Sequence, residues 1–353
     1  MSSYSAIDAI SPAIQRTKDF LFRPFKLGRF LKLTVVAMLT EGAFTGFNLN
    51  SKVPGSHGGK IPEIPPPHLT MPSMVAVGVG IAVLLLVAVP VMIFLSYLIL
   101  RLRFAFFDCV LFEQDQIAPA WRRYHEQALR YLWLTLGIAV GFWVVIAVVV
   151  GMSLWKYRVL LQSLFHGGPA QWVDFLPLFG IALGLFLFMG LFGLLVDTTL
   201  NYFVLPHMAL EDDSVSQAIG DVWGDMKADP WQFIVFLVMR VLLPIVAGII
   251  GMIAVLLPAL IVAGILFVIG LLLYSVSHGL TIAFGVIAGA GFAALVLCAM
   301  IGVGGTIGTF MRNYALLFYG GRYPELAKVL WPIPMPPPVQ PIMPGAGYPS
   351  GSF

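Results

Sequence analysis

Long apolar stretches alternate with short polar segments along this chain. A bilayer span needs about 20 mostly apolar residues, and six stretches meet that requirement. They cover residues 30–48, 72–107, 131–155, 175–208, 231–252 and 280–319. Because a helix rises about 1.5 Å per residue, the second, fourth and sixth exceed a hydrocarbon core of about 30 Å. We therefore predict an all-α integral membrane helical bundle with six long transmembrane helices.

The polar segments between these stretches repeat one pattern. Its three copies begin at Asp8, Asp115 and Asp213, and each places apolar or small residues 2, 5 and 6 positions later. This spacing forms the apolar stripe of an amphipathic helix. Each copy leads into a shorter span, a loop and a longer span. We interpret the sequence as three parallel repeats of an amphipathic helix plus two spans, at about 8–107, 115–208 and 213–319.

One further apolar segment, 255–274, lies where the other two repeats have an outer loop. Counting it as a seventh span would place the C-terminus outside, together with Arg312, Arg322 and Lys328. We expect a re-entrant or protein-buried helical excursion that is broken near Pro258 and satisfies its backbone groups internally. A true seventh span is the alternative.

The sequence predicts a single transmembrane domain over residues 1–331 and a tail over 332–353. The tail is rich in proline and almost without charge, which is typical of a flexible, partly extended arm. We place it in the cytoplasm, where it is either a docking peptide for a protein partner or an inert tail.

Composition supports the membrane assignment. Hydrophobic residues make up 59% of the chain and charged residues only 10%, whereas soluble domains carry about 25% charged residues. This excludes a soluble cytosolic enzyme, a disulfide scaffold and a disordered chain. A net charge of +3 is too small to indicate a nucleic-acid partner. Fifteen of the 20 basic residues lie in segments on the side of the N-terminus, so the positive-inside rule places both termini in the cytoplasm.

Enzyme and metal signatures are missing from the sequence. It contains no H-E-x-x-H, no G-x-S-x-G and no G-x-x-x-x-G-K-[ST] motif. The six histidines occur singly, at no spacing typical of metal ligands. We therefore expect no catalytic residue, no metal site, no cofactor and a non-enzymatic function.

The ionisable residues Glu41, Asp197 and Arg240 fall inside predicted spans, away from the span ends. Charge in a bilayer is costly and is usually kept for pairing or transport. One interpretation is a polar centre that binds a proton, a cation or a lipid headgroup. The other is a structural ion pair between Arg240 and one carboxylate, with Glu41 marking a helix break.

Other polar residues gather at the inner ends of the long spans, where they suggest cytoplasmic anchoring or contact with lipid headgroups. Basic residues on the amphipathic segments favour contact with anionic lipid. These interfacial candidates are Arg23, Lys26, Arg101, Arg103, Arg122, Arg123, Arg130, Arg312 and Asn313. The third amphipathic segment, 211–229, is acidic instead. We expect it to contact a basic protein partner or one of the other two amphipathic helices.

Three phrases carry a family resemblance: RPFKLGRFLKL at 23–33, RFAFFD at 103–108 and FVLPHM at 203–208. Over about residues 1–330 the chain resembles a group of uncharacterised bacterial polytopic proteins, similar in layout to the membrane domain that accompanies some glycerophosphodiester phosphodiesterases. The resemblance implies a bacterial inner-membrane location and repeated helical units. It does not imply phosphodiesterase activity, because the chain has neither a soluble catalytic domain nor a metal-ligand cluster.

Two functions remain in competition, and an intramembrane enzyme comes third. The first is an accessory or scaffolding membrane protein that binds lipid or a protein partner. The second is a transporter or lipid-handling protein that uses the polar site around Glu41, Asp197 and Arg240.

Overall fold

The computed structural model describes residues 4–42, 71–158 and 176–332. Within these ranges every regular element is a helix, which confirms the all-α prediction. The tail from residue 333, the two predicted outer loops at 49–71 and 156–172, and the end of the first predicted span lie wholly or largely outside the described residues.

The helices follow one another along the chain with short connections. They are α1 (Ile10–Phe22), α2 (Leu27–Ala37), the π-helical turn η1 (Met38–Gly42), α3 (Met71–Leu111), α4 (Ile117–Arg123), α5 (His125–Lys156), α7 (Leu176–Thr198), the π-helical turn η3 (Thr199–Val204), α8 (Leu205–Leu210), α9 (Val215–Ala228), α10 (Pro230–Tyr274), α11 (His278–Gly320) and α12 (Pro324–Leu330).

Five helical stretches of the described residues are long and apolar enough to cross a membrane. They are Ala82–Leu111, His125–Lys156, Leu176–Leu210, Pro230–Tyr274 and His278–Gly320. These stretches indicate a membrane protein. The first predicted span is not among them, because α2 and η1 together cover only residues 27–42 and residues 43–48 lie outside the described part. A sixth span therefore stays a prediction.

The segment 255–274 continues the preceding span. Helix α10 runs without interruption through Pro244 and Pro258, so the predicted break near Pro258 is wrong. Its large side chains are also exposed, including Leu256 and Leu260, so the segment is not buried in protein. Each proline removes one backbone hydrogen bond, but in an apolar run every other backbone group is satisfied only by continuing the helix. With 45 residues, α10 is about 67 Å long.

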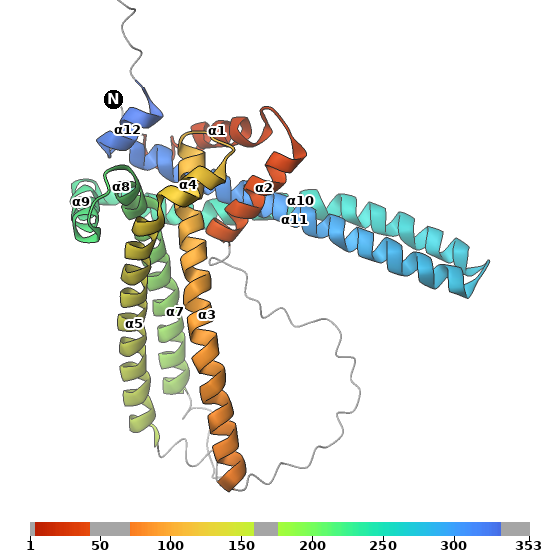
Figure 1. Ribbon diagram of the computed structural model, residues 1–353, viewed down its shortest axis with the longest axis horizontal. Coiled ribbons are helices and arrows are strands. Elements are labelled where there is room, and N and C mark those ends of the chain that lie inside the picture. Colours follow the sequence, from red (N-terminus) through yellow and green to blue (C-terminus); the bar gives the residue numbers. More distant parts are fainter. Residues whose placement is uncertain (1–3, 43–70, 159–175, 333–353) are drawn as a thin grey trace, which may run out of the picture.

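The short helices gather where the long helices meet (Figure 1). We call this region the base; its short helices are α1, α2, α4, α8, α9 and α12. Helices α1, α4 and α9 contain the three predicted amphipathic segments, and Ala13, Ala120 and Ala218 are buried at the same register position in each. Four residues later the side chains are again buried, as Thr17, Tyr124 and Val222. The apolar stripes thus pack inward as their spacing indicated. A threefold repeat of whole units stays a prediction.

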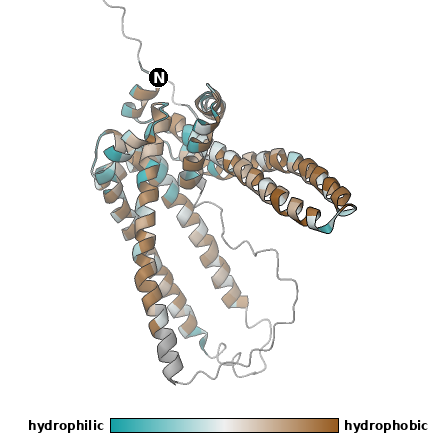
Figure 2. Ribbon diagram, turned by 45° about the vertical axis from the view of Figure 1, so that its right-hand side comes forward, coloured by the Kyte–Doolittle hydropathy of each residue, from teal (hydrophilic) through white to brown (hydrophobic). Residues whose placement is uncertain are grey.

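Two groups of long helices leave the base in different directions (Figure 1). Helices α3, α5 and α7 form one group, and the hairpin of α10 and α11 forms the other. Both groups are apolar along most of their length (Figure 2). This arrangement differs from the single bundle that we predicted. Apolar helix faces gain little by packing on each other instead of on lipid tails, so the sequence pattern does not fix the relative direction of the two groups.

Helix α11 crosses α2 at very close range. A Cβ atom at Gly305 would overlap the backbone of Thr34, and one at Gly308 would lie 3.0 Å from Glu41 Cβ. Glycine at these positions therefore lets the two helix axes approach. The crossing brings the end of α2 and η1 against the part of α11 that holds Arg312.

Candidate functional site

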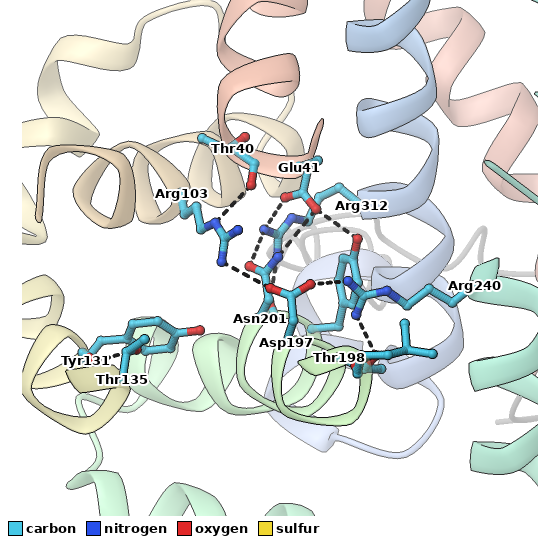
Figure 3. Close-up of polar contacts among 12 residues, drawn as sticks. Thr40, Glu41, Arg103, Tyr131, Thr135, Asp197, Thr198, Asn201, Arg240 and Arg312 are labelled. Atoms are coloured by element: carbon cyan, nitrogen blue, oxygen red, sulfur yellow. Dashed lines mark hydrogen bonds and ion pairs between the residues drawn. The ribbon is translucent and has the colours of Figure 1, made fainter. Parts of the chain in front are cut away.

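Five ionisable side chains from five different helical segments meet inside the base (Figure 3). They are Glu41 on η1, Arg103 on α3, Asp197 on α7, Arg240 on α10 and Arg312 on α11. We call this group, with Asn201 and Tyr202 of η3, the charge cluster. Segments that are up to 271 residues apart in sequence are joined here.

One half of the cluster is built around Asp197. Its carboxylate forms an ion pair with Arg240 through Oδ2 and lies 3.4 Å from Arg103 Nη1 through Oδ1. Arg240 also donates to Thr198 Oγ1 at 2.6 Å, and Arg103 Nε donates to the backbone oxygen of Thr40 at 2.9 Å. Asp197 is thus held by guanidinium groups from two other helices.

The other half is built around Glu41. Its Oε1 forms an ion pair with Arg312, and its Oε2 accepts a hydrogen bond from the Tyr202 hydroxyl at 2.8 Å. Arg312 also donates to the backbone oxygen of Asn201 at 2.8 Å and to its Oδ1 at 2.9 Å. With a side chain only 2% exposed, Glu41 is sealed in this network.

The ring of Tyr202 connects the two halves. The Arg240 guanidinium carbon lies 4.5 Å from the ring centroid, and that of Arg312 lies 5.2 Å from it. Both distances suit cation–π contact. The aromatic face therefore stabilises two arginines while the hydroxyl binds a carboxylate.

The charges in the cluster do not balance. With three guanidinium groups and two carboxylates in their ionised forms, the formal sum is +1. Buried charges of opposite sign lose hydration but gain mutual attraction, and removing one partner from such a pair is strongly destabilising. The cluster can therefore bind its helices together, and its excess positive charge favours anions over cations.

The structure brings together all three residues that we predicted inside the spans. Arg240 pairs with Asp197, while Glu41 pairs with Arg312 instead. Arg312 and Arg103 are only 1% and 7% exposed, so both lie in the protein interior and not at its surface, where a lipid headgroup could reach them. Asn313 is also fully buried, and its amide donates to Thr17 Oγ1 at 3.0 Å. Buried carboxylates and hydroxyls, rather than lipid, satisfy these polar groups.

The remaining interfacial candidates lie nearer the surface. Arg101 is partly buried, because its Nε donates to the backbone oxygen of Trp121 at 2.7 Å and its guanidinium covers the Trp121 ring. The exposed ones are Arg23, Lys26, Arg122, Arg123 and Arg130. Their exposure is what a lipid contact requires, although Arg23 forms an ion pair with Asp19 and Arg130 lies close to Asp212.

A groove of about 700 Å³ lies between α2 and α4. Its apolar lining includes Leu31 and Val35 of α2 and Trp121 of α4, and two exposed basic side chains, Lys32 and Arg122, also line it. The groove thus combines an apolar wall with positive charge.

The acidic segment forms several contacts within the chain. Asp212 lies 3.6 Å from Arg130 Nη1, and Asp229 lies 3.0 Å from Arg322 Nη2. The first contact reaches α5, directly after α4. A protein partner for segment 211–229 stays a prediction.

Three side chains of the described residues could share a metal ion: His207, Glu211 and Asp213. They lie at the end of α8 and in the turn before α9. Desolvation by burial, followed by the neighbouring Asp213 carboxylate, raises the pKa of Glu211.

Sequence reasoning missed Tyr202 and misplaced Arg103 and Arg312. One signal was available, because Arg103 and Asn201 each lie ten residues before the equivalent Glu113 and Glu211. That recurrence marked equivalent places on two long helices. It did not reveal that both places face the interior.

Comparison with known protein families identifies a family for this chain. A family model described as a family of unknown function, DUF7544, matches residues 4–329. No curated protein and no solved structure matches the chain. The resemblance to the membrane domain that accompanies glycerophosphodiester phosphodiesterases stays a prediction. Since the match covers nearly the whole chain, this protein belongs to the DUF7544 family of unknown function.

Proposed function

We propose that this chain is a non-enzymatic accessory or scaffolding protein of the bacterial inner membrane that binds anionic phospholipid in the groove between α2 and α4. The observation that carries the proposal is the groove itself, where an apolar wall and two basic side chains lie together. We place both termini in the cytoplasm, as the distribution of basic residues favours.

The chemistry of the groove suits a phospholipid. Leu31, Val35 and Trp121 offer apolar surface to an acyl chain, while Lys32 and Arg122 offer positive charge to a phosphate. Basic residues near a membrane surface attract anionic lipid by about 1 kcal/mol each. Helix α4 leads into α5, one of the candidate spans, which supports a position of the groove near headgroup depth.

The charge cluster supports a scaffolding role. Glu41 and Asp197 are each held by arginines from other helices, which is the arrangement expected of a structural joint. A protein that organises a partner needs a rigid platform. The acidic segment 211–229 and the Pro-rich tail are the surfaces that we propose for that partner.

Lipid-dependent stability tests the proposal. A ligand that binds only the folded protein raises its stability, by about 2.7 kcal/mol at 100 times its Kd. We expect phosphatidylglycerol to raise the unfolding temperature of the purified protein in detergent more than phosphatidylcholine does. The K32Q/R122Q double variant should lose this difference.

The matched control is R123Q, which removes one charge from the same helix outside the groove. It should keep the preference for phosphatidylglycerol. Equal stabilisation of wild type and K32Q/R122Q by phosphatidylglycerol would refute the groove as the binding site.

A transporter or lipid-handling protein is the second candidate. The observation that favours it is the pair of π-helical turns, because η1 holds Glu41 and η3 holds Asn201 and Tyr202. Such turns are frequent at functional sites. In proteoliposomes, solute flux or lipid movement that disappears in a folded E41Q/D197N variant would favour transport over scaffolding.

A further inference from the structure

The imidazole of His207 has a defined tautomer. His207 Nε2 lies 2.7 Å from the Tyr319 hydroxyl oxygen, and that hydroxyl donates its proton to Asp225 Oδ2 at 2.9 Å. A hydroxyl has only one proton to donate, so Nε2 must be the donor toward Tyr319. In the neutral ring, Nδ1 then carries the lone pair.

This lone pair faces two carboxylates. Nδ1 lies 3.8 Å from Glu211 Oε2 and 3.9 Å from Asp213 Oδ2, and it has no hydrogen-bond partner among the described residues. The side chain of His207 is only 4% exposed. Three electron-rich atoms therefore point at one another around a buried ring, an arrangement that a cation between them would stabilise.

The equivalent place directly after the first predicted repeat is neutralised differently. Glu113 and Asp115 have the same Glu-x-Asp spacing, but Arg16 Nε lies 3.5 Å from Glu113 and Arg29 Nη2 lies 2.6 Å from Asp115. The residue four positions before the glutamate is Cys109, whose thiol donates to a backbone oxygen. Two arginines thus supply the positive charge there.

In the part of the chain that the structure describes, no arginine neutralises Glu211 and Asp213 in this way. Within the described ranges, neither Lys nor Arg forms an ion pair with Glu211 or Asp213. Instead, His207 stands four residues before Glu211 and aims its free nitrogen at both carboxylates. The contrast between the two places points to a cation that replaces the missing arginines.

We propose that His207, Glu211 and Asp213 bind a divalent transition metal, with Zn²⁺ as the best match. Imidazole nitrogen and carboxylate oxygen are both ordinary Zn²⁺ ligands. The three donor atoms lie within 4.8 Å of one another, and Glu211 is 37% exposed, so its side chain can rotate to reach bonding distance. Water completes the tetrahedron.

The surrounding contacts match an outer ligand shell. A metal-bound histidine usually donates its other ring N–H to a further polar group, which fixes the tautomer. The Tyr319 hydroxyl and Asp225 take that role here. Since the ligands lie on α8 and in the turn before α9, the ion would fasten these two helices together.

Zinc titration of the full-length protein in detergent tests the site. After a chelator has removed bound metal and Zn²⁺ has been added, elemental analysis should find one Zn²⁺ per chain more in wild type than in E211Q. The unfolding temperature of wild type should rise with the added Zn²⁺. E211Q and H207Q should lose this ion. Y319F, which removes only the outer-shell hydroxyl, should weaken Zn²⁺ affinity by about 10-fold.

Two controls keep the test decisive. E113Q/D115N alters the same spacing in the arginine-neutralised copy and should bind Zn²⁺ like wild type. If H207Q fails to fold, E211Q still provides the test, because it changes a partly exposed side chain. Its unfolding temperature without metal shows whether E211Q is folded. The proposal is overturned if wild type binds no more Zn²⁺ than folded E211Q, or if E113Q/D115N loses the same ion. A protonated His207 paired with the carboxylates would give the first of these results.

Discussion

At the scale of single residues, pairing decides which charges the interior tolerates. A guanidinium inside an apolar helix is stable only when carboxylates or backbone oxygens replace its hydration. Arg240 and Arg312 meet this condition through Asp197 and Glu41, and Tyr202 adds its ring to both. The sequence could predict that Glu41, Asp197 and Arg240 are special, because charge stands out in an apolar run. It could not predict that Arg312 is buried, because an arginine near the end of a span has the same local pattern whether it reaches lipid headgroups or turns inward.

A double-mutant cycle on Asp197 and Arg240 tests the structural role of the pair. D197N leaves the buried Arg240 without its carboxylate, and we expect it to lower the free energy of unfolding by about 3–5 kcal/mol. R240Q should cost less, because Asp197 keeps its contact with Arg103. The double variant should lose less than the sum of the two. Chemical unfolding in detergent measures all three values.

The control cycle uses Asp19 and Arg23, an exposed ion pair four residues apart at the end of the first helix. Exposed pairs of this kind contribute at most about 0.5 kcal/mol. Additive losses in the Asp197–Arg240 cycle would show that the pair does not couple.

At the scale of helices, apolar length and stripe spacing are reliable guides, while boundaries and breaks are not. The five long helices and the inward face of the amphipathic segments agree with the sequence pattern. Pro258 misled the prediction, because a proline breaks a helix in water more readily than in a continuous apolar run, where the backbone has no other partner. The helix ends also differ from the prediction, because Arg103 and Arg312 are buried inside the protein instead of lying at the membrane surface.

Gly305 provides a test at this scale. Its position against the Thr34 backbone leaves no room for a side chain, and overpacking of this kind typically costs about 1–3 kcal/mol. We expect G305A to lower the free energy of unfolding by that amount. G304A is the matched control, because its Cβ would lie 3.7 Å from Met38 Cγ, an ordinary contact. Equal effects of the two substitutions would contradict the close crossing of α2 and α11.

At the scale of the whole molecule, the base carries the polar contacts and the long helices carry the apolar surface. Composition and apolar length predicted this division, but the different directions of the two helix groups could not be predicted. An apolar helix face is as stable against lipid tails as against another helix. The polar and close-packed contacts at the base therefore specify how the two groups of long helices are joined.

Orientation in the membrane follows from the same division. The basic residues of the base favour the cytoplasmic side, and the turn between α10 and α11 lies at the far end of the hairpin (Figure 1). We expect an impermeant thiol reagent to label V276C in intact cells. It should label K328C, in the helix after α11, only once the membrane is permeabilised. Labelling in the opposite order would invert the proposed topology.

Native mass spectrometry of the protein extracted in mild detergent tests lipid binding in the groove most directly, with wild type, E41Q/D197N and K32Q/R122Q compared side by side. We predict that wild type and the folded fraction of E41Q/D197N retain a bound anionic phospholipid, while K32Q/R122Q loses it. Loss of a bound lipid or solute in folded E41Q/D197N, with retention in K32Q/R122Q, would contradict binding in the groove and place the ligand at the charge cluster.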